Sequence, residues 1–336
     1  MLYRPNTLWT WVFFVSVCVE AVGLLFMETI MYTEFQSQHS PTAGGHAAGN
    51  ALPTFFWLNT LALIYQLLLV YDTLAHQNTF QVIGLAVYSA TLCVYNGLYR
   101  EQLDNALQAL AINGAIDMGF RESLSRWFIT LISITAIFTL WILFSAWRLY
   151  GEFSWVTVQK VKADMIMQRK YLCFQLLISI LKFDGFFFLG FILQMITLVG
   201  FGEWNDHEFA LVITTIPVSC GLLFLTGWVI RHENNVGTMV AGTLHLGLLG
   251  FFGWRLALIY GDSWTLYLPA QQSLTFFGGL TVLFAVATIV MIVLCYRNFR
   301  QGLRPYISGE SKARLFGETF EMERREEYAV ISSEMR

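Results

Sequence analysis

Residues 171–201 read YLCFQLLISILKFDGFFFLGFILQMITLVGF. The run is apolar and long enough to cross a bilayer, which takes roughly 20 residues of helix. Lys182 and Asp184 nevertheless lie near its middle, where a charged side chain costs roughly 2.5–3.5 kcal/mol on insertion scales. Both side chains are therefore predicted to face other helices or a wet cavity, inside a membrane bundle with a polar interior.

The composition of the whole chain agrees with a membrane protein. Of its 336 residues, 56% are hydrophobic and only 13% are charged, whereas soluble domains average about 25% charged residues. The formal net charge of −3 argues against a nucleic-acid partner, which would need a basic surface. The lipid bilayer is the partner that the composition predicts, together with an unknown small solute or protein.

Eight apolar segments predict an all-α, polytopic transmembrane bundle. These spans cover residues 8–31, 53–74, 80–99, 127–149, 171–201, 209–230, 237–260 and 273–296. A seven-span version, with one weak span lying in the interface, is the alternative. Residues 1–296 then form the bundle, and residues 297–336 form a polar, partly disordered cytosolic tail. Residues 100–125 predict a helical extension or an interfacial helix, and residues 151–170 predict a polar loop.

The placement of basic residues predicts that both termini are cytosolic, because cytosolic loops carry an excess of Lys and Arg. The predicted cytosolic side holds Arg4, Arg148, Lys160, Lys162, Arg169, Lys170, Arg231, Arg297, Arg300 and Arg304. The opposite side holds only Arg100, Arg121, Arg126 and Arg255.

Four ionisable residues in spans one, five and seven form the predicted intramembrane polar cluster: Glu20, Lys182, Asp184 and His245. At about 1.5 Å per residue, all four lie roughly 12–20 Å from the cytosolic face. Lys182 and Asp184 point about 200° apart on their helix, so each needs a partner elsewhere. We predict a Glu20–Lys182 ion pair and a His245 that shares or shuttles a proton with Asp184. A structural clamp and a functional cavity both remain open.

Other intramembrane features have simpler interpretations. Asp72 and Arg148 are predicted to lie at headgroup level, and the aromatic run 186–188 is predicted to face lipid. A face of small residues in span seven predicts close approach of a neighbouring helix. That face consists of Gly242, Gly250 and Gly253.

Motifs for catalysis and cofactor binding are absent from the sequence, which contains no H-E-x-x-H, G-x-S-x-G, P-loop or G-x-G-x-x-G pattern. We therefore predict no enzyme activity, no cofactor and no metal site. His39 and His46 in a flexible segment are better read as solvated loop residues than as metal ligands. In the tail, Tyr328 and Ile331 have the spacing of a tyrosine-based cytosolic sorting motif.

Three stretches carry a resemblance to a known family: YGEFSWVTVQKVKAD (150–164), LLISILKFDGFFFLGFILQ (176–194) and CYRNFRQGL (295–303). On these stretches the chain resembles an uncharacterised family of fungal multi-pass membrane proteins of the Golgi apparatus. The resemblance implies residence in the Golgi membrane, with another endomembrane or the plasma membrane as the alternative. It implies no reaction.

Two functions from different classes therefore remain. A transporter would have a water-accessible cavity that reaches the polar cluster. A membrane trafficking or scaffold protein would have a closed, dry bundle in which the same charges are structural ion pairs.

Overall fold

The computed structural model describes residues 7–38, 46–112, 118–160, 165–199, 206–261 and 271–298. These residues form α1 (Leu8–Gln38), α2 (His46–His76), α3 (Thr79–Ile112), α4 (Met118–Lys160), α5 (Met165–Gln194), α6 (Asp206–Arg231), α7 (Asn235–Leu258) and α9 (Gln271–Arg297), with a π-helical turn, Met195–Val199, after α5. Among the described residues, eight helices are long and apolar enough to cross a membrane. The predicted all-α polytopic bundle is therefore confirmed, with eight spans rather than seven.

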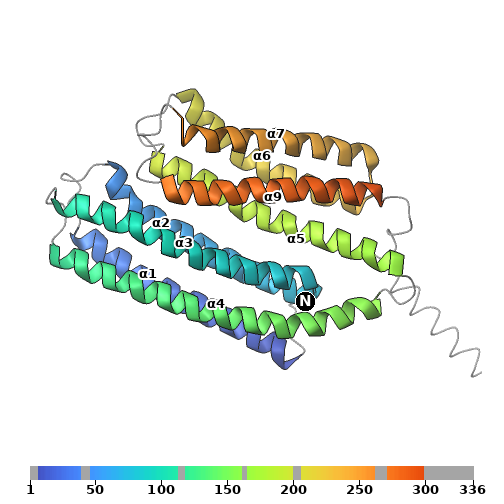
Figure 1. Ribbon diagram of the computed structural model, residues 1–336, viewed down its shortest axis with the longest axis horizontal. Helices are drawn as coiled ribbons and strands as arrows, with labels where there is room; N and C mark the ends of the chain where they lie inside the picture. The colour runs from blue at the N-terminus through green and yellow to red at the C-terminus, as the bar shows by residue number, and fades with distance from the viewer. Residues whose placement is uncertain are drawn as a thin grey trace, which may run out of the picture.

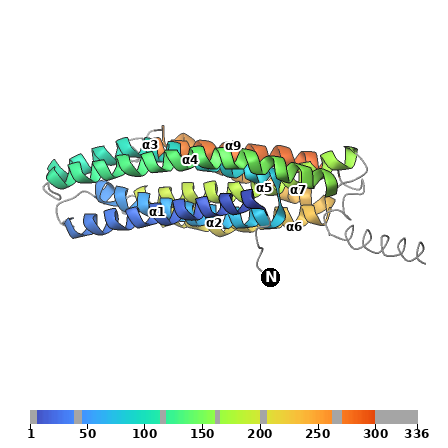
Figure 2. The same ribbon diagram turned by 90° about the horizontal axis from the view of Figure 1, so that it is seen from below.

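The helices form two halves that lie side by side (Figure 1). Helices α1 to α4 pack on one another in one half, and α5, α6, α7 and α9 pack on one another in the other. The view turned by 90° shows the long helices running together along the length of the molecule (Figure 2). The seam between the halves is made chiefly by α5 against α2 and α3, with α9 also against α3.

The helices extend beyond the apolar runs that predict them. Helix α3 continues to Ile112, so the helical extension predicted within residues 100–125 is confirmed. The polar loop predicted for residues 151–170 is wrong in large part, because α4 continues to Lys160 and α5 begins at Met165. Hydropathy predicts where a helix leaves the hydrocarbon core of the bilayer. It does not predict where the helix ends, because a helix can continue into water with polar side chains. The predicted tail beyond residue 298, with Tyr328 and Ile331, lies outside the described residues.

The aromatic run of α5 lies in the core of the molecule. Phe186, Phe187 and Phe188 are each only 1% exposed, so the prediction that they face lipid is wrong. Phe187 stacks on Phe284 of α9, and Phe188 packs on Phe252 of α7, both with ring centroids 4.9 Å apart. Helix α5 has neighbouring helices on most sides, namely α2, α3, α6 and α9, so its aromatic residues are buried in the bundle.

Close helix approach depends on glycines other than the predicted ones. A Cβ added at Gly84 of α3 would lie 2.2 Å from the ring of Phe183, and one at Gly190 of α5 would lie 2.7 Å from the ring of Phe277. On the predicted glycine face of α7, only Gly242 has a neighbour within 4 Å, the side chain of Ile292 at 3.7 Å. The tight contacts form instead between α3 and α5 at the seam and between α5 and α9 within one half.

Candidate functional site

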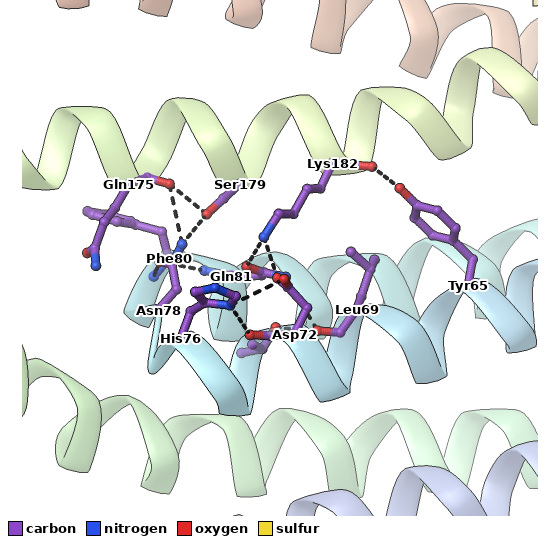
Figure 3. Close-up of polar contacts among 11 residues, drawn as sticks. Tyr65, Leu69, Asp72, His76, Asn78, Phe80, Gln81, Gln175, Ser179 and Lys182 are labelled. Atoms are coloured by element: carbon purple, nitrogen blue, oxygen red, sulfur yellow. Dashed lines mark hydrogen bonds and ion pairs between the residues drawn. The ribbon is translucent and has the colours of Figure 1, made fainter. Parts of the chain in front are cut away.

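Lys182 is held at the seam by side chains from two other helices (Figure 3). Its ammonium group forms an ion pair with the Asp72 carboxylate of α2. Gln81 of α3 donates to the same carboxylate oxygen at 2.7 Å and accepts from the Lys182 ammonium at 3.3 Å. The three side chains satisfy one another's charge and hydrogen-bonding groups, so this cluster joins the two halves of the molecule.

The turn between α2 and α3 places Gln81 in this cluster. Gln77 adopts a left-handed backbone conformation with φ 51°, and the side-chain oxygen of Asn78 then accepts from the backbone N–H groups of Phe80 and Gln81. This is N-capping by an Asn, which favours the start of a helix at this point. The amide of Asn78 also donates to the hydroxyl of Ser179 at 2.9 Å, so the turn is tied to α5 as well.

The predicted Glu20–Lys182 ion pair is wrong. Glu20 accepts instead from the side-chain amide of Gln66 on α2 at 3.1 Å, and the partner of Lys182 is Asp72, which the sequence had placed at headgroup level. Helices α2 and α5 are offset along their axes, so Lys182, 17 residues after the start of α5 at Met165, lies beside the last turns of α2.

A second contact between α1 and α2, made by Glu28, was not predicted from the sequence. The buried carboxylate of Glu28 accepts from the side-chain amide of Asn59 and from the hydroxyl of Thr60 at 3.3 Å. Glu20 and Glu28 are eight residues apart on α1, and Asn59 and Gln66 are seven apart on α2. This matched spacing on consecutive antiparallel spans is the signal that could have found both contacts.

Asp184 and His245 do not form the predicted proton-sharing pair. One carboxylate oxygen of Asp184 accepts from the hydroxyl of Thr288 on α9, whereas the Nδ1 atom of His245 lies 2.9 Å from the backbone oxygen of Ala241. Among the described residues, Asp184 Oδ1 and His245 Nε2 have no hydrogen-bond partner. The four predicted residues thus lie in separate contacts rather than in one cluster.

The two main cavities of the described structure have mostly apolar walls. One of about 500 Å³ lies between α5 and α6 and is bordered by Lys182 and Arg231. The other, of about 740 Å³, lies between α6 and α7 and is lined by aliphatic residues, Phe251 and two threonines. Neither cavity is lined by Glu20, Asp184 or His245. In the part of the chain described here, no three His, Cys, Asp or Glu residues are placed to hold a metal ion.

Comparison with known proteins gives one informative match. The chain is 22% identical over 279 residues to a UPF0658 Golgi apparatus membrane protein of Schizosaccharomyces pombe, covering 76% of this chain and 78% of that protein. The chain resembles the UPF0658 family. The match confirms the resemblance predicted from the three sequence stretches, and with the eight apolar helices it confirms a multi-pass protein of the Golgi apparatus membrane.

The UPF0658 resemblance gives a location and no reaction. No protein-family model matches the chain. No solved structure matches it either.

Proposed function

We propose that this chain is a trafficking or scaffold protein of the Golgi membrane, without enzyme activity, whose intramembrane charges clamp its helices together. The observation that carries the proposal is the Lys182 cluster. The ammonium of Lys182 is matched by Asp72 and Gln81 from two other helices. A group that must bind and release a solute needs access to water, whereas a clamp needs only its protein partners.

The buried carboxylates support the same proposal. Glu20, Glu28 and Asp184 each accept a hydrogen bond from a neutral side chain on a different helix. Such contacts between spans are a usual way to hold membrane helices in register. Two of these contacts join α1 to α2, and the third joins α5 to α9. They therefore stabilise both halves of the bundle and do not outline a single path.

Solute transport is the second candidate, because the cavity of about 500 Å³ reaches Lys182. A transport path would make Lys182 necessary for activity itself, beyond its part in folding. The wall of this cavity is mostly aliphatic and aromatic, which suits hydrocarbon better than a hydrated solute. The clamp is therefore the better supported function.

Paired substitutions separate the two functions. Lys182→Met is expected to lower stability by about 1–3 kcal/mol, because Asp72 loses its charged partner while neither side chain is fully buried. The double variant Lys182→Met/Asp72→Leu is expected to regain most of this loss, because no unpaired charge is left. Unfolding of the purified chain in detergent, and its level and location in cells, are the measurements.

The control is Lys170→Met, which removes the same charge at the start of the same helix. It is expected to leave stability unchanged. If the double variant folds and reaches the Golgi but the cells still show the null phenotype, Lys182 acts in function directly and the clamp proposal fails.

A further inference from the structure

The cavity between α5 and α6 has the form of a groove, which we call the α5–α6 groove. Its wall includes Ile178 of α5 and Leu223, Phe224 and Trp228 of α6, and it encloses about 500 Å³. Arg231, the last residue of α6, stands at one end. The groove therefore combines a long apolar wall with a single cationic end.

Hydrocarbon, not water, is the medium that this groove meets. Phe224 is 78% exposed and Trp228 is 50% exposed, and the two lie four residues apart on one face of α6. Phe224 lies inside the span Phe209–Arg231, and Trp228 lies one turn before its end at Arg231, where exposed tryptophans lie at the lipid interface. The opening of the groove is consequently within reach of acyl chains.

Two glycines, Gly185 and Gly227, leave space inside the groove because they have no side chains. A Cβ added at Gly227 would have only the end of Ile178 near it, at 4.0 Å, and one at Gly185 would meet Tyr65 and Leu223 at 3.4 and 3.6 Å. Larger residues at these positions would project into the groove. The hollow thus depends on two missing side chains rather than on a gap between separated helices.

The length and charge of the groove match one lipid. Six residues of α6 border it, from Cys220 to Arg231. These two ends are eleven positions apart, which is roughly 16 Å at 1.5 Å per residue and about half of a 30 Å hydrocarbon core. Arg231 is exposed, and no Asp or Glu among the described residues lines the groove. A guanidinium group binds phosphate through parallel hydrogen bonds.

We propose that the α5–α6 groove binds one glycerophospholipid, with an acyl chain along α6 and the lipid phosphate on Arg231. The bound lipid belongs to the leaflet on the side of Arg231, which the distribution of basic residues predicts to be the cytosolic leaflet. Lys182 contributes its aliphatic stem to the wall, while its ammonium remains with Asp72. The site does not depend on the proposed scaffold function, because a lipid bound here is compatible with either candidate.

A protein helix fits this groove poorly. A helix with its side chains is about 10–12 Å across, whereas the groove holds a volume typical of a small ligand, roughly 300–1,000 Å³. The remaining alternative is a second copy of the chain against the groove, which would give a crosslinked dimer in place of a phospholipid adduct.

The test measures lipid retained by the full chain. The chain is reconstituted into vesicles of equal parts phosphatidylcholine and phosphatidylserine, extracted again into detergent, and analysed by native mass spectrometry. The wild type is expected to retain one phospholipid, and Gly227→Leu is expected to lower this occupancy by about tenfold or more, because the leucine projects into the groove and displaces part of the acyl chain. Gly221→Leu adds the same side chain to α6 where nothing lies within 4 Å, and it is expected to retain the lipid.

The contact between Arg231 and the lipid phosphate is tested by a separate variant. Arg231→Gln is expected to lower retention about tenfold through loss of the charge-assisted hydrogen bonds. Arg126→Gln removes an exposed arginine at the opposite end of the bundle and is expected to leave retention unchanged. Retention that is equal in Arg231→Gln and Arg126→Gln would overturn the phosphate contact.

Photocrosslinking tests the same site in a chain that keeps Gly227, so it does not depend on the folding of Gly227→Leu. A benzoylphenylalanine placed at Phe224, irradiated after extraction into detergent, is expected to give a phospholipid adduct of the monomer. The same group at Leu140 of α4, which is 68% exposed and outside the groove, is expected to give none. A crosslinked dimer, no adduct at Phe224, or equal lipid retention in Gly227→Leu and Gly221→Leu would each overturn the lipid site.

Discussion

Replacing Phe186 with alanine is expected to lower the free energy of unfolding by about 3–5 kcal/mol, the range for large-to-small changes in a packed core. Phe186 is 1% exposed and sits at the seam between the two halves. Its ring centroid lies 5.6 Å from Tyr65, 4.9 Å from Tyr88 and 6.1 Å from Phe277. One ring therefore packs against α2, α3 and α9 at once.

The physical reason for this cost differs from that in a soluble protein. Lipid tails are as apolar as a phenylalanine ring, so helix association depends on van der Waals packing rather than on exclusion of water. Phe186→Ala leaves a cavity at the seam, and the side chains that line it lose their contacts with the ring without compensation. Thermal unfolding of the purified chain in detergent measures the loss.

Phe26→Ala is the matched control for Phe186→Ala. Phe26 is 68% exposed on α1, so lipid or detergent replaces its contacts and little change is expected. If both variants lose the same stability, the seam is not a packed core and the two-half description is wrong.

Gly84→Leu is expected to destabilise the chain by about 1–3 kcal/mol or more, as overpacking does in a tight core. Even a Cβ at this position would lie 2.2 Å from one atom of the Phe183 ring and 2.5 Å from another. Phe183 is itself buried, so its ring has little room to move. The strain is expected to separate α3 from α5 at the seam, with a lower unfolding temperature as the readout.

Gly97→Leu on the same helix is the control, because nothing lies within 4 Å of a Cβ at that position. Leucine has a higher helix propensity than glycine by roughly 1 kcal/mol, so this variant is expected to be neutral or slightly stabilised. A second change, Phe183→Ala, is expected to relieve part of the strain in Gly84→Leu. Additive losses in that double variant would show that the ring is not what the leucine meets.

Part of the candidate site could be predicted from residues alone. Asp184 is fully buried and the ammonium of Lys182 is paired within the bundle, as expected of charges deep in an apolar run. The partners could not be predicted in the same way. The ion pair of Lys182 joins residues 110 positions apart, and the choice between Glu20 and Asp72 depends on how far α5 projects past α2.

By itself, the sequence determined that this protein is an all-helical membrane protein with eight or seven spans, because a bilayer of constant thickness requires apolar runs of a certain length. It also determined that the ionisable residues of the fifth span need partners inside the bundle, because an unpaired charge is costly in hydrocarbon. Only the tertiary structure decided which residues those partners are, that the Phe186 region is core, and where the groove lies. These depend on the relative register and rotation of packed helices, which local pattern does not contain.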